Sequence, residues 1–194
     1  MELKFTMLGA NRFAFKEWAV TCTALATGRQ SLLLRKGGIS ERGGRFEVEH
    51  REIWLFPTRF HQTPHEIRDN ARDLMTVVTN DAPAPGLVNL SLYAVVEDVS
   101  ELTDESRLAR LADLQILSQR TLVDRFRYRR PILFVLPARI YRREQSITIV
   151  DTPQLAGCRT WVELGEELST DGLTPILSDR MHTDRMKAIR SALR

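Results

Sequence analysis

The chain has 194 residues and a mass of 22.3 kDa, which suits one domain or one domain with a tail. Hydrophobic residues make up 43% and charged residues 27%, so the chain can bury a core without disulfides or a structural metal. Two cysteines, Cys22 and Cys158, exclude a disulfide scaffold and lack metal-ligand spacing. No apolar run is long enough to span a bilayer, and the first residues lack a signal-peptide pattern. We therefore expect a cytoplasmic protein with no membrane contact.

Charge is spread unevenly along the chain. The 28 basic and 25 acidic residues give a net charge of only +3. Between Arg120 and Arg143, however, eight arginines accompany one acid, Asp124, whereas residues 97–114 hold six acids and two arginines. A concentrated basic stretch indicates an anionic partner. The alternative is a solvated helix face that pairs with the acidic stretch before it.

The first half of the chain predicts two helices among short strands. Apolar residues recur at helical steps from Phe15 to Ala26, with Asn11 as the N-cap and Gly28 as the stop. A second helix should begin at Pro64, capped by Thr63, and reach Val78. Strands are expected between these helices at residues 30–35, 46–50 and 52–56.

The second half continues the alternation of strands and helices. We expect a helix from Thr103 to about Phe126 and a last helix capped by Ser178 or Thr183. Strands are expected at residues 87–99, 132–142, 147–150 and 160–164. The fold class is therefore α+β, a small mixed β-sheet or pseudo-barrel with helices packed outside. We expect one domain over residues 1–165 and a C-terminal helical extension over residues 166–194.

Histidines and glutamates cluster early in the chain, so a metal site has to be considered. The cluster consists of Glu47, Glu49, His50, His61 and His65. Imidazole and carboxylate groups are common ligands of zinc and iron, but this spacing matches no known site. A metal-dependent nuclease using Glu47, Glu49 and His50 is thus an alternative function. Our prediction is that the chain has no catalytic residues, no metal and no cofactor.

Basic residues alternate with aromatic ones in the pattern that favours nucleic-acid binding. The segments are 125–130, 139–143 and the glycine-lined strand end 35–38. Arginine pairs with phosphates, aromatic rings stack on bases, and glycine lets a backbone approach closely. Alternatively, Phe126 and Tyr128 anchor a helix in the core.

Five segments resemble an uncharacterised bacterial family, domain of unknown function 1802 (DUF1802). They are residues 15–20, 32–39, 46–50 and 56–62, and the run Gly157-Cys-Arg-Thr-Trp-Val-Glu-Leu164. The resemblance covers the chain to about residue 165. Some members of that family are joined to a restriction-endonuclease domain, which implies a role near DNA restriction or defence.

A more distant resemblance is to the PUA-like superfamily, including its ASCH and EVE branches. It rests on Trp18-Ala19, Gly28, Leu34-Arg35 and the segment Tyr93–Val99. PUA-like domains are compact pseudo-barrels that bind RNA or modified bases in DNA, typically without catalysis. The resemblance implies a cleft near Arg35, Lys36, Gly37 and Gly38, with Trp18 beside it.

These observations together predict a non-catalytic nucleic-acid-binding module that reads a modified base. DNA and RNA remain open as ligands, and the C-terminal helix is expected to contact a protein partner. A further alternative function is a protein-interaction component that docks on its partner through this helix. The predicted nucleic-acid-binding residues are Trp18, Arg35, Lys36, Gly37, Gly38, Arg127, Tyr128, Arg129, Arg130, Arg139, Arg142 and Arg143.

Overall fold

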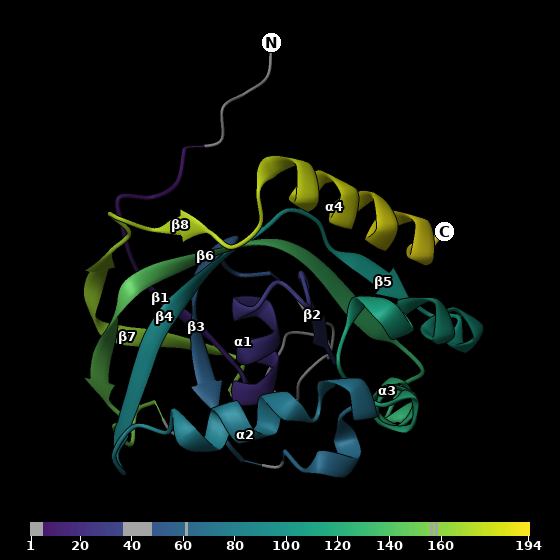
Figure 1. The fold of residues 1–194 in the computed structure, drawn as a ribbon, viewed down its shortest axis with the longest axis horizontal. Helices are drawn as coiled ribbons and strands as arrows, with labels where there is room; N and C mark the ends of the chain where they lie inside the picture. Colours follow the sequence, from purple (N-terminus) through teal and green to yellow (C-terminus); the bar gives the residue numbers. More distant parts are fainter. Residues whose placement is uncertain (1–5, 37–47, 61, 156, 158) are drawn as a thin grey trace.

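The computed structural model describes residues 6–36, 48–60, 62–155, 157 and 159–194. Within these residues, eight strands form one mixed sheet that curves around a central helix (Figure 1). The main strand order is β2-β6-β4-β3-β1-β7, and β5 and β8 each pair with β6. The strands are β1 (Ala10–Trp18), β2 (Leu32–Arg35), β3 (Glu52–Thr58), β4 (Leu87–Val96), β5 (Ser100–Leu102), β6 (Leu133–Val150), β7 (Trp161–Ser169) and β8 (Thr174–Pro175).

The prediction of a helix capped by Asn11 is wrong up to Trp18, because residues 10–18 are a strand. These residues form β1, which runs parallel to β3 and antiparallel to β7, and α1 (Ala19–Ala26) begins only after Trp18. Hydrogen bonds to two distant strands thus override the local apolar spacing. Asn11 is no helix cap, because its Nδ2 donates to the Glu52 carbonyl at 2.7 Å and to the Tyr93 hydroxyl at 3.0 Å. The helix stop at Gly28 is confirmed by its φ of +69°.

Two expected long helices are each broken into short pieces. The first comprises the 3-10 turns η2 (Pro64–Glu66) and η3 (Asp69–Ala71) and the helix α2 (Asp73–Asn80). The second comprises the 3-10 segment η4 (Glu105–Leu114) and the helix α3 (Gln119–Arg127). The points at which the two segments are interrupted lie side by side, because Ile67 and Leu117 form an isolated β-bridge. Tertiary hydrogen bonds there replace the helical ones.

The strand predictions are mostly confirmed, with changed boundaries. The strands expected at residues 132–142 and 147–150 are one 18-residue strand, β6, which begins at Leu133. It pairs with β2 and β5 near its start and with β4 further on. The strand expected at 52–56 continues through Pro57 as β3. Of the strand expected at 46–50, residues 46 and 47 lie outside the described residues, and residues 48–50 are not in a strand.

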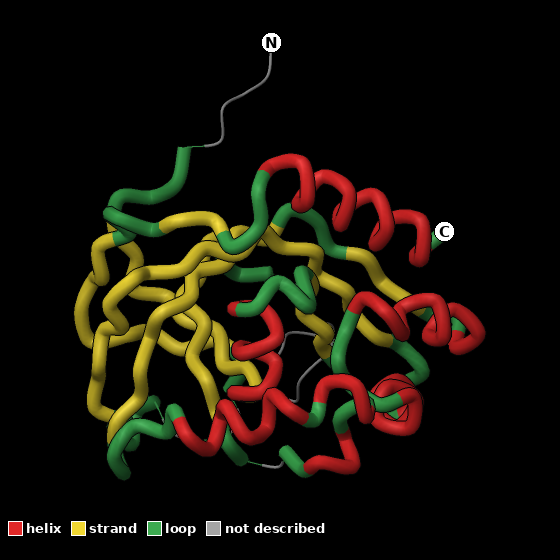
Figure 2. Tube along the Cα trace, in the orientation of Figure 1, coloured by secondary structure: helices red, strands yellow, loops and turns green. Residues whose placement is uncertain are grey.

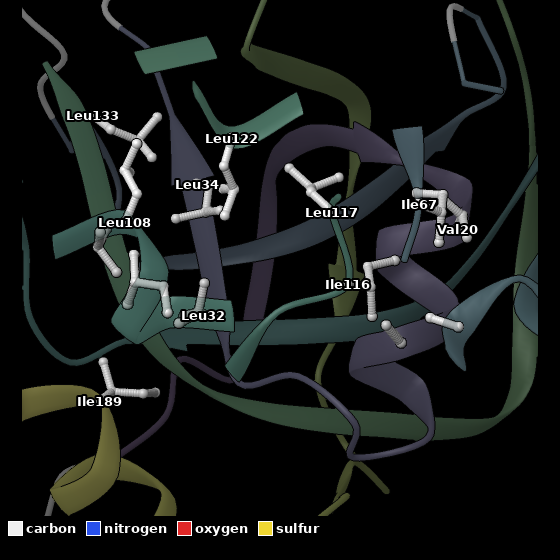
Figure 3. Close-up of a cluster of buried hydrophobic side chains, with 14 of the residues drawn as sticks. Val20, Leu32, Leu34, Ile67, Leu108, Ile116, Leu117, Leu122, Leu133 and Ile189 are labelled. Carbon is white, nitrogen blue, oxygen red and sulfur yellow. The ribbon is translucent and has the colours of Figure 1, made fainter. Parts of the chain in front are cut away.

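The core lies on both faces of the sheet and between the sheet and the helices. Figure 3 shows the largest buried cluster, to which Val20 of α1, Leu32 and Leu34 of β2 and Leu122 of α3 all belong. α1 is short and buried on most of its sides, whereas α2, α3 and α4 (Asp179–Leu193) lie around the sheet (Figure 2). The α+β class with a mixed sheet is confirmed, although α1 lies inside rather than outside.

The C-terminal segment packs against the rest of the chain. Ser178 caps α4 as expected, and Met186, Ile189 and Ala192 of this helix are buried. The proposed domain boundary at residue 165 falls within β7, which pairs with β1. Among the described helices, none combines the length and apolar character needed to cross a membrane.

Candidate nucleic-acid interface

A groove of about 920 Å³ opens where the end of β1, the turn η2 and one face of α3 come together. We call it the Trp18 groove. Thr121, Arg125 and Tyr128 point into it because spacings of four and three residues share one helix face. Its lining consists of Trp18, Lys36, Thr63, His65, Glu66, Arg120, Thr121, Asp124, Arg125 and Tyr128.

Trp18 and Arg125 stack on each other in this groove. The guanidinium carbon of Arg125 lies 4.1 Å from the centre of the Trp18 ring, a cation–π distance. The ring also packs against the largest hydrophobic cluster, so it is partly buried. Burial lowers the pKa of the Arg125 guanidinium, although the nearby charge of Glu17 acts in the opposite direction. The groove therefore holds a cation in a partly desolvated position.

Lys36 supports the turn that follows α3. Its Nζ donates to the carbonyl oxygens of Phe126, Arg130 and Ile132. All three N–H groups of the ammonium are therefore engaged in hydrogen bonds. Burial lowers the pKa of Lys36. The turn itself is strained, since Arg129 has a φ of +63°. Lys36 thus holds in place the turn that presents Tyr128, which is 58% exposed.

Arg35 lies beneath the groove rather than on its surface. Its guanidinium forms an ion pair with Glu17 at 3.3 Å, and the side chains of the pair are 15% and 3% exposed. It also stacks over the Phe15 ring at 4.1 Å and donates to the Lys16 carbonyl. Arg35 therefore connects β2 to β1 and supports the strand end that carries Trp18.

A profile described as "domain of unknown function (DUF1802)" matches residues 14–188. The chain belongs to this family. The DUF1802 chain is also similar to crystal structures of an ASCH protein from Zymomonas mobilis, ZmASCH. A serine-to-alanine variant of that protein aligns at a TM-score of 0.44 and 14% identity, over 93% of this chain and 98% of the other. The unaltered protein aligns at 0.42 and 14%, over 91% and 94%. No curated protein matches the chain.

The other arginines predicted to bind nucleic acid lie at several places on the DUF1802 chain. Arg129 and Arg130 are exposed on the turn after α3, next to the Trp18 groove. Four others bind groups of the chain itself: Arg127 pairs with Glu105 at 2.6 Å, Arg139 pairs with Asp179, Arg142 donates to the Ala26 carbonyl, and Arg143 donates to the Ser169 carbonyl at 2.8 Å. Gly37 and Gly38 lie outside the described residues.

The predicted histidine–glutamate cluster is divided between two grooves. Glu49 and His50 line a groove of about 670 Å³ formed by β1, β3 and β7, whereas His65 lines the Trp18 groove. His50 stacks on Phe13 at 3.5 Å, and burial lowers its pKa. Glu47 and His61 lie outside the described residues. Among the residues that the structure does describe, no three His, Cys, Asp or Glu side chains are grouped so that they could hold a metal ion.

Sequence reasoning missed several residues of the Trp18 groove. In the sequence Arg125 is one of many arginines and no pattern marks it as a site residue, and the same is true of Thr63, Glu66 and Arg120. The helical spacing of Thr121, Arg125 and Tyr128 was the available signal for one shared face. Nothing local links Arg125 to Trp18, which is more than a hundred positions away in the DUF1802 sequence.

Proposed function

We propose that this DUF1802 chain is a non-catalytic nucleic-acid-binding module that reads a modified base in a restriction or defence setting. The observation that supports the proposal is the Trp18–Arg125 stack at 4.1 Å, in one groove with the exposed ring of Tyr128. Unpaired bases stack on such aromatic faces, and a guanidinium pairs with the phosphates between them.

The size and charge of the groove agree with this proposal. A volume of about 920 Å³ is large enough for one nucleotide and belongs to the range of small-ligand pockets. Arg129 and Arg130 add two exposed positive charges at the adjoining turn. Glu66 and Asp124 supply carboxylates in the lining that could accept hydrogen bonds from the edge of a base.

The proposed protein contact of the C-terminal helix would have to use the outer face of α4. The inner face is occupied by the chain itself, since Met186 and Ile189 are buried against its core. Met181 on the outer face is 56% exposed and would be part of such a contact.

The test is binding of fluorescently labelled single-stranded DNA, single-stranded RNA and duplex DNA, each with and without base modifications. Affinity should fall steeply as salt rises, because phosphate contacts release counterions. Tyr128→Ala should weaken binding by about 5- to 150-fold, corresponding to about 1–3 kcal/mol for one stacked base.

Two controls make this experiment specific. Tyr128→Phe keeps the ring and should bind normally, and Phe60→Ala removes an aromatic ring that is 75% exposed outside the groove lining. No binding at low salt to any of the oligonucleotides would refute the proposal. Cleavage of the probes on addition of Mg²⁺ or Mn²⁺ would instead support the nuclease alternative with Glu47, Glu49 and His50.

A further inference from the structure

The guanidinium of Arg125 has no anionic partner in the part of the chain that the structure describes. Among the described residues, the guanidinium stacks on the Trp18 ring, which accepts no ordinary hydrogen bond. The charges of two nearby carboxylates, Glu17 and Glu66, raise the pKa of Arg125, against the larger effect of burial. Glu17 is paired with Arg35 at 3.3 Å, and Glu66 accepts from the backbone nitrogen of Thr63 at 2.7 Å.

Each of the other half-buried arginines of the described chain has a hydrogen-bond acceptor, either a carboxylate or a backbone carbonyl oxygen. Some pair with a carboxylate, as Arg35 does with Glu17 and Arg68 does with Asp113 at 2.9 Å. Others donate to a carbonyl oxygen, as Arg185 does to Gly28 at 3.1 Å. Arg12 likewise donates to the carboxylate of Glu163 and Arg139 to that of Asp179, whereas Arg107 donates to the carbonyl oxygen of Leu193.

An unpaired cation that is partly removed from water carries a free-energy cost, so proteins normally supply it with an acceptor. A guanidinium presents five N–H donors in a planar fork, whose geometry matches the oxygens of a phosphate. Arg120 on the same helix adds positive charge to the groove lining. Lys36 adds a further charge, but its N–H groups already donate to backbone carbonyls. Asp124, also in the lining, pairs with Arg120 at 3.7 Å and not with Arg125.

We infer that the Arg125 guanidinium is the receptor for one phosphate group of a ligand in the Trp18 groove. The inference rests on the proposed function in one respect: it assumes that this phosphate belongs to a nucleic-acid strand. The shared chemistry is a phosphate ester, which a free nucleotide also carries. The Trp18 ring would hold the guanidinium in place, and the N–H groups of the guanidinium would donate hydrogen bonds to the ligand.

The binding test uses the full chain and three small probes: adenosine 5′-monophosphate, inorganic phosphate and adenosine. Binding is followed through the indole N–H resonance of Trp18 and by calorimetry. We expect the two phosphate-bearing probes to shift this resonance more than adenosine does. Arg125→Gln should weaken their binding at least tenfold, whereas Arg142→Gln, which changes an arginine outside the groove, should not.

A stability measurement separates a ligand-binding arginine from a structural one. Arg125→Met removes a cation that has no ion pair among the described residues, so its melting temperature without ligand should equal or exceed that of the parent chain. Arg35→Met leaves the buried Glu17 carboxylate unpaired and should melt at a lower temperature. Phosphate should raise the melting temperature of the parent chain but not that of Arg125→Met.

The outcomes distinguish the inference from the proposed function. Oligonucleotide binding that is undiminished in Arg125→Gln would overturn the phosphate site and leave the proposed function standing. Phosphate binding that depends on Arg125, with no oligonucleotide bound at low salt, would support the site and refute the proposed function. A parent chain that binds none of the phosphate-bearing probes would overturn the inference.

Discussion

The carboxylate of Glu17 and the guanidinium of Arg35 form an ion pair at 3.3 Å beneath the Trp18 groove. Glu17 also accepts a hydrogen bond of 2.7 Å from the backbone nitrogen of Trp18. One carboxylate thus connects the end of β1, the end of β2 and the residue whose ring stacks on Arg125. The pair is a structural support for the groove, since both of its side chains are largely buried.

Breaking this pair on one side should destabilise the fold strongly. Glu17→Gln leaves the Arg35 guanidinium buried without its counter-charge, which typically costs about 3–5 kcal/mol. The double variant Glu17→Gln/Arg35→Met removes both charges and should lose less stability than the two single variants added together. Denaturant unfolding of the three variants measures this coupling. Strictly additive losses would show that the pair contributes no coupling.

Salt dependence should identify the arginines that contact phosphates. Arg129 and Arg130 are exposed beside the groove, whereas Arg142 and Arg143 donate to carbonyl groups of the chain itself. We therefore expect Arg129→Ala/Arg130→Ala to reduce the slope of log affinity against log salt by about 0.7 per lost contact on a single strand. Arg142→Ala/Arg143→Ala is the matched control, and an equal reduction by this pair would place the contact surface on β6 as well.

Lys36 should affect binding through the shape of the turn and not through direct contact. Its Nζ donates to three backbone carbonyls, which Lys36→Met would leave without that donor. We expect this variant to lower the free energy of unfolding by about 1–3 kcal/mol. Oligonucleotide affinity should fall because Tyr128 is no longer held, while the salt slope should stay the same. A slope reduced by about 0.7 would instead show that Lys36 touches a phosphate.

Acid should destabilise the chain partly through Glu97, which lies 2.6 Å from Nε2 of the buried His182 on α4. The hydrogen bond from His182 holds the pKa of Glu97 below its ordinary value of 4.5, and the charges of Arg190 and Arg139 act in the same direction. The unfolded chain therefore binds a proton at Glu97 more readily than the folded chain does. This stabilisation is complete above about pH 4.5 and is lost as the pH falls through the lower folded value.

The measurement is the free energy of unfolding at a series of pH values from 7 to 3. Glu97→Gln should be less stable than the parent chain at pH 7, by about 1 kcal/mol, and should lose less stability on acidification. Glu166→Gln changes an exposed carboxylate of β7 and serves as the control, with the acid response of the parent chain. Identical acid responses for Glu97→Gln and the parent chain would contradict the role of Glu97.

The sequence alone was sufficient for the features that depend on near neighbours. The α+β class, the buried strand at β2, the stop at Gly28 and the cap at Ser178 all follow from local apolar spacing, φ preference or side-chain capping. The family also followed from short motifs within the chain. Tyr128 follows from the local pattern of aromatic residues next to basic ones, whereas Trp18 follows from the resemblance to the PUA-like superfamily.

Tertiary structure alone decided the features that depend on distant partners. Residues 10–18 became a strand because β3 and β7 supply hydrogen bonds that no local spacing reveals. Lys36 and Arg35 look like surface cations in the sequence, but folding engages one with backbone carbonyls and the other with Glu17. Arg125 looks like one arginine among eight, and only folding places it against Trp18 without an ion pair to any carboxylate of the described chain. Charge runs can be counted in a sequence, but the pairing of charges depends on which groups folding brings within a few ångströms.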